Sequence, residues 1–422
     1  MRKVLVVGAG QSGLHLAHGL LSHDYDVTLI TAKTSTEIRT GRPAVTQFTL
    51  PTVLKYEQAH HLDFWAGVAP RMEEFNVSLY SGGGPGVSLR GNFGDGQYAI
   101  SVDRRVKMAD WLEYFEDRGG KVVIHGVTLS DLDYFSRMFD LVVIAVGAGE
   151  LGDLFDHDPN RFSGARPRVL TQAYLYDVTS DSYGDGDAGW VASTSNGGHI
   201  FLVPVLTSQG PCHSLFVVDK PGNLMDLSKP DRHPDPDEVL NQMKGVLKRC
   251  APEYYERCKD ASLVDGNSVL LQTLRPQVRK PVGTLPSGGS VLGIADVVIT
   301  SDPAGGQGWN NSTRCAESYL SSILEHGDRP FDRDTLAGMF ERFWEYGQHA
   351  EQFVQSIATM GESATPPEHF AEFIGAAMTY PEVADRWVQG WNDPTDYQNW
   401  LFAPDLTRAY LAEVQARNSN NG

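Results

Sequence analysis

Hydrophobic positions change their spacing several times along the chain, and each change predicts a different element. Residues 4–7 and 26–31 form short apolar runs, whereas residues 14–21 between them carry apolar side chains at helical spacing. This strand–helix–strand order predicts a βαβ unit at the start of the chain. The apolar run at residues 141–146 predicts a further, central strand of the same sheet.

The rest of the chain shows two other patterns. Residues 198–206 and 212–220 have the composition of two strands joined by a hairpin around residues 207–211. From Asp334 onward, apolar residues recur at helical spacing to about Val414. We therefore predict an α/β fold with a parallel-sheet domain, an inserted β-sheet domain and a C-terminal helical region. The expected boundaries are 1–170 plus 265–330 for the first domain, 171–264 with parts of 43–100 for the second, and 331–422 for the helical region.

The composition narrows the choice of partners and location. The 422 residues carry a formal net charge of −18, which argues against nucleic acid and anionic membranes as partners. No apolar run reaches the roughly 20 residues that span a bilayer. The four cysteines form no C-x-x-C pair and the histidines show no ligand spacing, so we expect a cytoplasmic protein without a metal site. The adjacent His60 and His61 would point to opposite faces of a strand, which argues against a shared metal ion.

A glycine-rich turn follows the first predicted strand. Gly8, Gly10 and Gly13 have the spacing G-x-G-x-x-G, and the helical pattern starts directly after them. Glycines at these positions allow the tight turn and the close approach of a pyrophosphate, which the amides of the helix N-terminus then bind. The acidic residue that usually holds a ribose is missing after the second strand, which ends at Thr31. We expect hydroxyls and basic side chains, among them Arg42, to hold the adenosine end instead.

The same glycine spacing occurs a second time, after the strand predicted at residues 141–146. Gly147, Gly149 and Gly152 are followed by a segment rich in proline and glycine, which shows no sustained apolar period. Because no amphipathic helix starts there, the amides that a pyrophosphate needs are missing. We therefore expect one dinucleotide site and not two, and we expect a Gly152→Ala protein to bind the dinucleotide nearly normally.

A third segment, residues 290–327, indicates which dinucleotide binds. It has the pattern of a strand, then Asp296, then a loop of proline and glycine, then a helix. A carboxylate at a strand end can accept hydrogen bonds from a ribityl hydroxyl, and a glycine-rich helix start can direct amides at a flavin ring that is negatively charged when reduced. An alternative is that Asp296 only caps a turn.

These segments resemble the flavin-dependent aromatic monooxygenases of the p-hydroxybenzoate hydroxylase fold, and most closely the oxygenase component of styrene and indole monooxygenases. The resemblance extends along nearly the whole chain, and DPxxGQG at residues 302–308 is its most specific element. The other matching segments are VGAGQSGLHLA (7–17), TGRPAVTQ (40–47), SVDRRVKMADWLEYFEDRGGKVV (101–123), FDLVVIAVGAGELGDLF (139–155) and, more weakly, WNDPTDYQNWLFAPD (391–405).

The resemblance implies a Rossmann-like FAD-binding domain, an inserted substrate domain and a set of cofactor contacts. The implied FAD contacts are Gly8, Gly10, Gly13, Arg42, Arg104 and Asp296, and the implied lining of the flavin ring is Pro303, Ala304, Gly305, Gly306, Gln307 and Gly308. The side chains expected closest to oxygen transfer are Val45, Thr46 and Gln47 on one wall and residues 303–305 on the other. The styrene-type family has an asparagine where this chain has Val45, so we expect an apolar pocket for a neutral aromatic substrate.

The resemblance also implies the reaction. Enzymes of the styrene type receive reduced FAD from a separate NADH-dependent reductase and use O2 to epoxidise or hydroxylate an aromatic substrate through a flavin C4a-(hydro)peroxide. Like them, this chain lacks the D-G pair that serves FAD and NADPH in single-component hydroxylases, and it has Gly147-Ala148-Gly149 there. The cofactor carries this chemistry, so we expect no protein acid or base. The resemblance is also compatible with a homodimer of this chain.

Three other functions compete with this hypothesis. A single-component NAD(P)H-dependent aromatic hydroxylase is the main alternative, and NADH oxidation by the protein alone would identify it. A flavin-dependent halogenase is disfavoured because the W-x-W-x-I-P signature is absent. A flavin carrier or sensor without enzymatic activity would bind FAD and form no oxygenated product.

Overall fold

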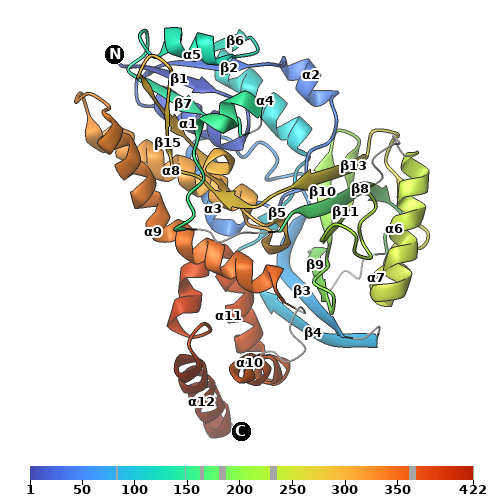
Figure 1. Cartoon of the computed structure of the whole chain (residues 1–422). Coiled ribbons are helices and arrows are strands. Elements are labelled where there is room, and N and C mark those ends of the chain that lie inside the picture. The colour runs from blue at the N-terminus through green and yellow to red at the C-terminus, as the bar shows by residue number, and fades with distance from the viewer. Residues whose placement is uncertain are drawn as a thin grey trace.

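Two β-sheets and a group of C-terminal helices make up the protein (Figure 1). The computed structural model describes residues 1–81, 84–147, 149–161, 166–179, 187–228, 235–360 and 367–421. The first sheet lies at the N-terminal end of the molecule, the second sheet lies beside it, and the C-terminal helices extend from the region where the two meet (Figure 1).

The first sheet has six strands, and β1 (Lys3–Val7) lies in its interior. β1 pairs in parallel with β2 (Asp26–Thr31) on one side and with β7 (Leu141–Ile144) on the other, as the apolar runs predict. All four residues of β7 are buried, which is typical of a central parallel strand covered on both faces. The strands outside this triplet are β6 (Lys121–Ile124) next to β2, and β16 (Ser290–Gly293) and β15 (Val282–Thr284) next to β7.

Helices from distant parts of the sequence pack around this sheet. α1 (Gln11–Leu21) packs against α8 (Gly308–His326) and α4 (Arg104–Asp117). Gly19 allows the first contact, because a Cβ there would lie 2.5 Å from the Leu320 side chain. The shorter helices of this part are α2 (Ser35–Arg39), α3 (Pro51–Ala59), α5 (Leu129–Phe135) and the 3-10 turn η1 (Gly149–Leu154).

The second sheet has nine strands and is built from non-contiguous segments. The predicted hairpin is present, with β10 (His199–Thr207) antiparallel to β11 (Gly210–Asp219). β3 (Arg71–Ser81) pairs in parallel with β9 (Asp187–Thr194), which joins residues from the expected 43–100 segment to this sheet. The other strands are β4 (Gly84–Asn92), β5 (Ala99–Ile100), β8 (Arg168–Tyr176), β12 (Ser262–Leu263) and β13 (Val269–Leu274).

The domain boundary expected at residue 265 differs from the pairing of the strands. β13 forms six residue pairs with β8 and belongs to the second sheet, and the chain returns to the first sheet only at β15. Between them, β14 (Gln277–Val278) pairs with β17 (Ile299–Thr300) in a small two-stranded sheet. The segment that forms β13 shows no clear alternation of apolar and polar residues, so its hydrophobic pattern does not reveal the strand.

Both faces of the second sheet are buried, and they face different partners. Along β10, Ile200 and Leu202 pack with α6 (Pro236–Cys250) and α7 (Pro252–Cys258), whereas Phe201 and Val203 point to the opposite face. Alternate side chains of a strand point to opposite faces, so a continuous apolar run is what a doubly covered strand requires. The face that carries Phe201 packs against the C-terminal helices.

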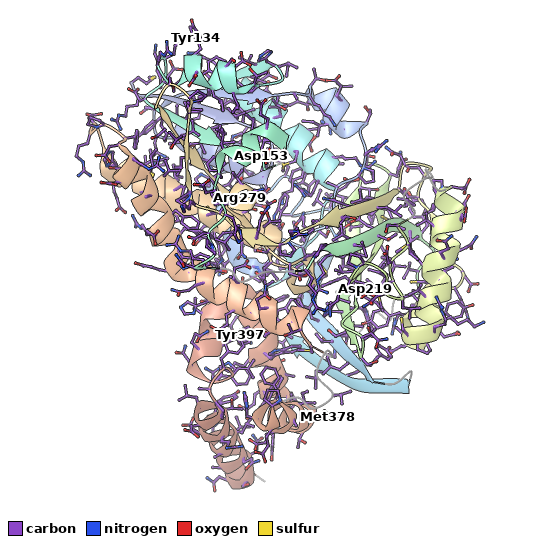
Figure 2. The ribbon with its side chains drawn as sticks, viewed as in Figure 1. Tyr134, Asp153, Asp219, Arg279, Met378 and Tyr397 are labelled. Atoms are coloured by element: carbon purple, nitrogen blue, oxygen red, sulfur yellow. The ribbon has the colours of Figure 1, made fainter. Side chains whose placement is uncertain are left out.

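The predicted C-terminal helical region is present. It comprises α9 (Arg333–Ala358), α10 (Glu368–Thr379), α11 (Pro381–Asn392), the 3-10 turn η4 (Pro394–Asn399) and α12 (Pro404–Asn421). Its core contains the buried side chains of Trp387, Trp391, Trp400 and Tyr397. Figure 2 labels Tyr397 in this region. None of the helices within the described ranges is long and apolar enough to cross a membrane.

A fully buried ion pair lies between α3 and α4. The Lys107 ammonium donates to both oxygens of Glu57, at 2.7 and 2.8 Å, and to the Thr49 hydroxyl at 3.1 Å. Both charged side chains have no exposed surface. Three indole rings surround the ammonium, with ring centroids 4.7 to 5.6 Å from Nζ; they belong to Trp65, Trp111 and Trp309.

Candidate functional site

A cavity of about 420 Å³ opens at the carboxyl ends of β1 and β7, where the two sheets meet. Ligands of open α/β sheets bind at such strand ends. One part of its wall comes from the glycine-rich turn, α4 and the start of α8, and the other part comes from the second sheet. The predicted residues that line it are Gly10, Val45, Thr46, Gln47, Arg104, Asp296, Pro303, Gly306 and Gly308.

Two helices direct uncapped N-termini at this cavity. Gly10 is the N-cap of α1 and Gln307 is the N-cap of α8, and neither residue makes a side-chain capping hydrogen bond. The first amides of both helices therefore remain available to a ligand, and both helix dipoles favour negative charge in the cavity. This arrangement fits a dinucleotide whose pyrophosphate lies at α1 and whose ring lies at α8.

The first glycine motif folds as its spacing predicts. Gly8 has a φ of +119°, and a Cβ at Gly13 would lie 2.1 Å from the carbonyl oxygen of Gly8. The turn and the helix start are thus in contact, with no space for a side chain between them.

The second glycine motif makes a similar close contact without the helix. Residues 149–154 form the 3-10 turn η1, which agrees with the absence of a predicted α-helix. A Cβ at Gly152 would lie 2.4 Å from the backbone oxygen of Gly147. Alanine at Gly152 must therefore displace this turn, which the sequence pattern does not show. Nearly normal cofactor binding by Gly152→Ala stays a prediction.

Arg104 and Asp296 supply the charged groups of the cavity wall. Arg104 begins α4, stacks over Trp309 at 5.5 Å, and has a buried Nε without a partner among the described residues. An unpartnered guanidinium donor fits an anionic cofactor. The Asp296 side chain is accessible from the cavity, but protein encloses it elsewhere and this burial raises its pKa, against the lowering effects of Arg104 and Ser312.

The backbone beside Asp296 is strained. Ala295 has a φ of +51°, a left-handed conformation that residues with a side chain seldom adopt. Ala295 begins the 3-10 turn η2 (Ala295–Val297), so this conformation directs Asp296 out of β16 and toward the cavity. Strain of this kind concentrates at functional sites. Asp296 lies inside η2, whose N-cap is Ile294, so the turn-cap alternative has no support here.

The opposite part of the cavity is apolar and comes mainly from the second sheet. Phe201 and Phe216 are paired across β10 and β11 with ring centroids 5.6 Å apart. Thr46 is held by a hydrogen bond between its hydroxyl and that of Ser214 at 2.7 Å, and the Gln47 amide donates to the Val102 carbonyl at 3.1 Å. The apolar lining residues of this part are Val45, Phe48, Phe201, Val203, Phe216 and Leu274.

Seven predicted site residues lie outside the cavity lining. Two of them, Gly8 and Gly13, form the close contact of the glycine-rich turn. Arg42 is exposed on the loop after α2, and Thr31 is buried at the end of β2 with its hydroxyl bonded to the Lys33 carbonyl at 3.3 Å. Ala304 and Gly305 are buried behind Pro303 in the 3-10 turn η3 (Pro303–Gly305), and the Gln307 amide donates to the Trp391 carbonyl at 2.8 Å. For these seven residues a role toward the cofactor stays a prediction.

Other lining residues were not anticipated from the sequence. Phe201, Val203 and Phe216 lie on strands that the sequence predicts, but the face that each residue occupies depends on a doubly covered sheet. Ser301 and Trp309 flank the DPxxGQG segment and could have been inferred from it. The remaining unanticipated lining residues are Gln11, Ser12, Ala44, Phe48, Ala145, Gln272, Leu274, Thr300 and Ser312.

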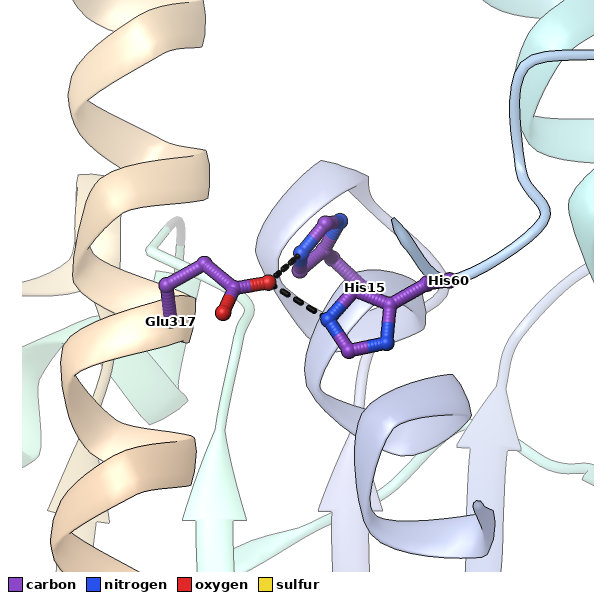
Figure 3. A group of neighbouring side chains, drawn as sticks. All are labelled: His15, His60 and Glu317. Carbon is purple, nitrogen blue, oxygen red and sulfur yellow. Dashed lines mark hydrogen bonds and ion pairs between the residues drawn. The ribbon is translucent and has the colours of Figure 1, made fainter. Parts of the chain in front are cut away.

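A second group of titratable side chains joins α1, the end of α3 and α8 (Figure 3). Nε2 of His15 lies 2.5 Å from Oε1 of Glu317, and Nε2 of His60 lies 2.6 Å from the same oxygen. The prediction that His60 and His61 occupy a strand is wrong, because His60 caps the C-terminus of α3. One ligand atom from each of the three side chains lies within 4.8 Å of the others, which is a spacing that could hold a metal ion. In this structure both histidines contact the same oxygen of Glu317.

Replacing Glu317 by glutamine is expected to destabilise the protein in a pH-dependent way. Burial raises the pKa of Glu317, but the hydrogen bonds from His15 and His60 lower it more, to about 2 from an ordinary value of 4.5. The stabilisation is therefore present above pH 4.5 and is lost as the pH falls toward 2. At neutral pH we expect a loss of up to about 3 kcal/mol in the free energy of unfolding.

Chemical denaturation of both proteins over a range of pH measures this difference. The difference between wild type and variant should shrink below about pH 4. A difference that is constant with pH would show that the carboxylate charge does not stabilise the fold.

Replacing Asp296 by alanine is expected to weaken FAD binding. If its carboxylate accepts a hydrogen bond from the ribityl chain, the variant loses about 1.5–3 kcal/mol, and the dissociation constant rises about tenfold or more. Fluorescence titration with FAD measures the change, with Asp328→Ala as an exposed control. An unchanged dissociation constant would remove Asp296 from the cofactor contacts.

Comparisons with known proteins agree with this geometry. Residues 147–257 match a family described as "Styrene monooxygenase A putative substrate binding domain". The chain is 26% identical over 408 residues to styrene monooxygenase StyA from Pseudomonas fluorescens, with 96% of each protein covered. A second StyA, from Pseudomonas sp, is also 26% identical, over 415 residues and 96% of each chain. These matches confirm the resemblance to styrene monooxygenases.

Solved structures support the fold. The flavin-dependent brominase Bmp2 superimposes with a TM-score of 0.66 at 13% identity, covering 98% of this chain and 99% of its own. The flavin-dependent halogenase CmlS gives a TM-score of 0.65 at 15% identity, covering all of this chain and 78% of its own. The predicted α/β fold is confirmed.

Proposed function

We propose that this chain, a relative of the styrene monooxygenases over 96% of its length, is the oxygenase component of a two-component flavin monooxygenase. In this proposal a separate NADH-dependent reductase supplies reduced FAD, and O2 is used to epoxidise or hydroxylate a neutral aromatic substrate. Indole-like and styrene-like compounds are the first substrates to test.

The observation that carries the proposal is one cavity with two chemically different parts. Uncapped starts of α1 and α8, the unpartnered Nε of Arg104 and the carboxylate of Asp296 lie on the part that fits FAD. Reduced flavin, when bound, supplies the chemistry that activates oxygen. The chain binds and orients it, and the aromatic and aliphatic wall formed by the second sheet excludes water from the adjoining space.

The charge of the lining residues supports a neutral substrate. Among the lining residues that the structure describes, Arg104 is the one basic side chain, and it lies on the cofactor part. An anionic substrate in the apolar part would lose its hydration without a compensating charge, which is costly. Val45 adds to the apolar wall, as its comparison with the family's asparagine suggested.

Reconstitution with and without a reductase tests the proposal. The protein with FAD, NADH, O2 and indole or styrene is expected to consume no NADH and to form no product. Adding an NADH:FAD reductase should start product formation, detected as styrene oxide or as indigo from oxidised indole. FAD that has been chemically reduced should support a single turnover without any reductase.

Other outcomes point to other functions. NADH oxidation by the protein alone would contradict the two-component proposal and identify a single-component hydroxylase. Product that contains bromine, when bromide is present, would identify a halogenase. FAD binding without product from any substrate would favour a carrier or sensor.

A further inference from the structure

Glu351 is a buried carboxyl group that lies directly behind the cavity wall. It belongs to the middle of α9 and is 6% exposed. Its Oε1 accepts a hydrogen bond from the hydroxyl of Ser301, and Ser301 itself lines the cavity. One hydroxyl group therefore separates this carboxyl from the space in which we place the flavin.

The surroundings of Glu351 offer it no cation. Asp302, the residue after Ser301, is paired with Arg168 at 2.7 Å, and both side chains are at most 5% exposed. Within the described residues Glu351 makes no ion pair. The side chain on α8 that contacts Ser301 is neutral: the Asn311 amide nitrogen lies 3.4 Å from the Ser301 hydroxyl oxygen. The pKa of Glu351 is raised to about 7, mainly by burial. The hydrogen bond from Ser301 lowers this pKa, and the carboxyl groups of Asp302 and Asp296 raise it further.

The proposed function requires a proton at this place. When the anionic reduced flavin, O2 and an alkene react, one oxygen atom enters the product and the other leaves as water. The balance is reduced flavin anion plus O2 plus alkene plus one proton, giving oxidised flavin, epoxide and water. The flavin contributes one of the two hydrogens of that water, so the second must come from outside the flavin.

We propose that Glu351 holds this proton and passes it into the cavity through the hydroxyl of Ser301. When Glu351 is ionised, the Ser301 hydroxyl donates to it; when Glu351 is protonated, the bond runs in the opposite sense. The carboxyl then donates its proton to the Ser301 oxygen while Ser301 releases its own proton toward the cavity, so the hydroxyl ends unchanged and the carboxyl ends ionised. Glu351 acts through Ser301 and does not itself touch the flavin or the substrate, so its role is to hold the proton in position. The inference rests on the proposed function, because it needs a reduced flavin in the cavity.

A structural role is the competing explanation. The same hydrogen bond joins α9 to the loop after β17, so its loss could loosen the cavity wall without any effect on protons. The number of protons taken up on binding reduced FAD separates the two explanations. An anion placed near Glu351 raises its pKa further, so binding near neutral pH should take up about half a proton per site.

Anaerobic titration calorimetry with reduced FAD, in buffers of different ionisation enthalpy, measures this uptake. Wild type and Glu345→Gln, an exposed control on the same helix, should take up the same number of protons. Glu351→Gln should bind reduced FAD with little or no uptake. Equal uptake by Glu351→Gln and wild type would overturn the proposal.

Ser301→Ala provides a second test that does not depend on the folding of Glu351→Gln. Removing the hydroxyl takes away a hydrogen bond that lowers the pKa of Glu351. The pH at which uptake is half complete should therefore rise, while single-turnover product formation slows. An unchanged midpoint would contradict the relay. If neither the wild-type protein nor any variant binds reduced FAD, the proposed function fails. If reduced FAD binds but the proton uptake does not depend on Glu351, only the relay is overturned.

Discussion

Replacing Gly13 by valine is expected to abolish FAD binding. A Cβ at this position would lie 2.1 Å from the Gly8 carbonyl oxygen and 3.1 Å from the Ala145 side chain. The start of α1 must then move away from β1, and the amides that we assign to the pyrophosphate move with it. We expect a loss of more than about 3 kcal/mol, which is over a hundredfold in the dissociation constant.

Fluorescence titration with FAD measures the effect, and circular dichroism shows whether the variant is folded. Gly338→Val is the matched control, because Gly338 also lies in a helix and no other part of the protein comes within 4 Å of the place that a Cβ would take. A folded Gly13→Val protein that binds FAD as tightly as wild type would show that the cofactor lies elsewhere.

Of the substitutions proposed for this protein, Lys107→Met is expected to cause the largest loss in the free energy of unfolding. The substitution leaves the Glu57 carboxylate fully buried without its cation and removes the donor that bonds to the Thr49 hydroxyl. Breaking a buried ion pair in this way costs about 3–5 kcal/mol in the free energy of unfolding. The expected result is a clearly lower midpoint in thermal or denaturant unfolding.

A double variant supplies the control for this loss. Lys107→Met with Glu57→Leu removes both charges and should recover most of the stability, because a buried pair can often be replaced by apolar groups at little cost. If the single variant is as stable as wild type, Glu57 has become protonated or hydrated at little cost. If the double variant is no better than the single one, the loss comes from packing among the three indole rings.

Local patterns predicted the part of the fold that depends on neighbouring residues. The βαβ unit, the turn at Gly8 and the hairpin of β10 and β11 each occupy one continuous segment, so spacing and turn residues specify them. The pairing of β3 with β9 and of β13 with β8 joins distant segments, and no local pattern shows which strands will meet. For this reason β13 belongs to the second sheet although it lies beyond the boundary expected at residue 265.

The candidate site divides along the same line. Gly10, Arg104 and Asp296 follow strands or begin helices, and they meet because the carboxyl ends of parallel strands share one edge. Phe201 and Phe216 depend on which face of a doubly buried strand turns toward the cavity, which an unbroken apolar run does not show. Glu351 lies in a helix whose sequence gives no sign that its neighbour is a cavity wall.

The parallel pairing of β3 with β9 also affects folding during synthesis on the ribosome. β3 and β4 leave the ribosome together and can form their hairpin at once, but the other edge of β3 must wait for residues 187–194. Until then one edge of β3, which carries Phe75, Val77 and Leu79, keeps unpaired backbone groups, and such an edge is a site for association between chains. Nascent chains of this protein are therefore exposed to aggregation from the synthesis of β3 until β9 has emerged, and slow translation of that interval would lengthen the exposure.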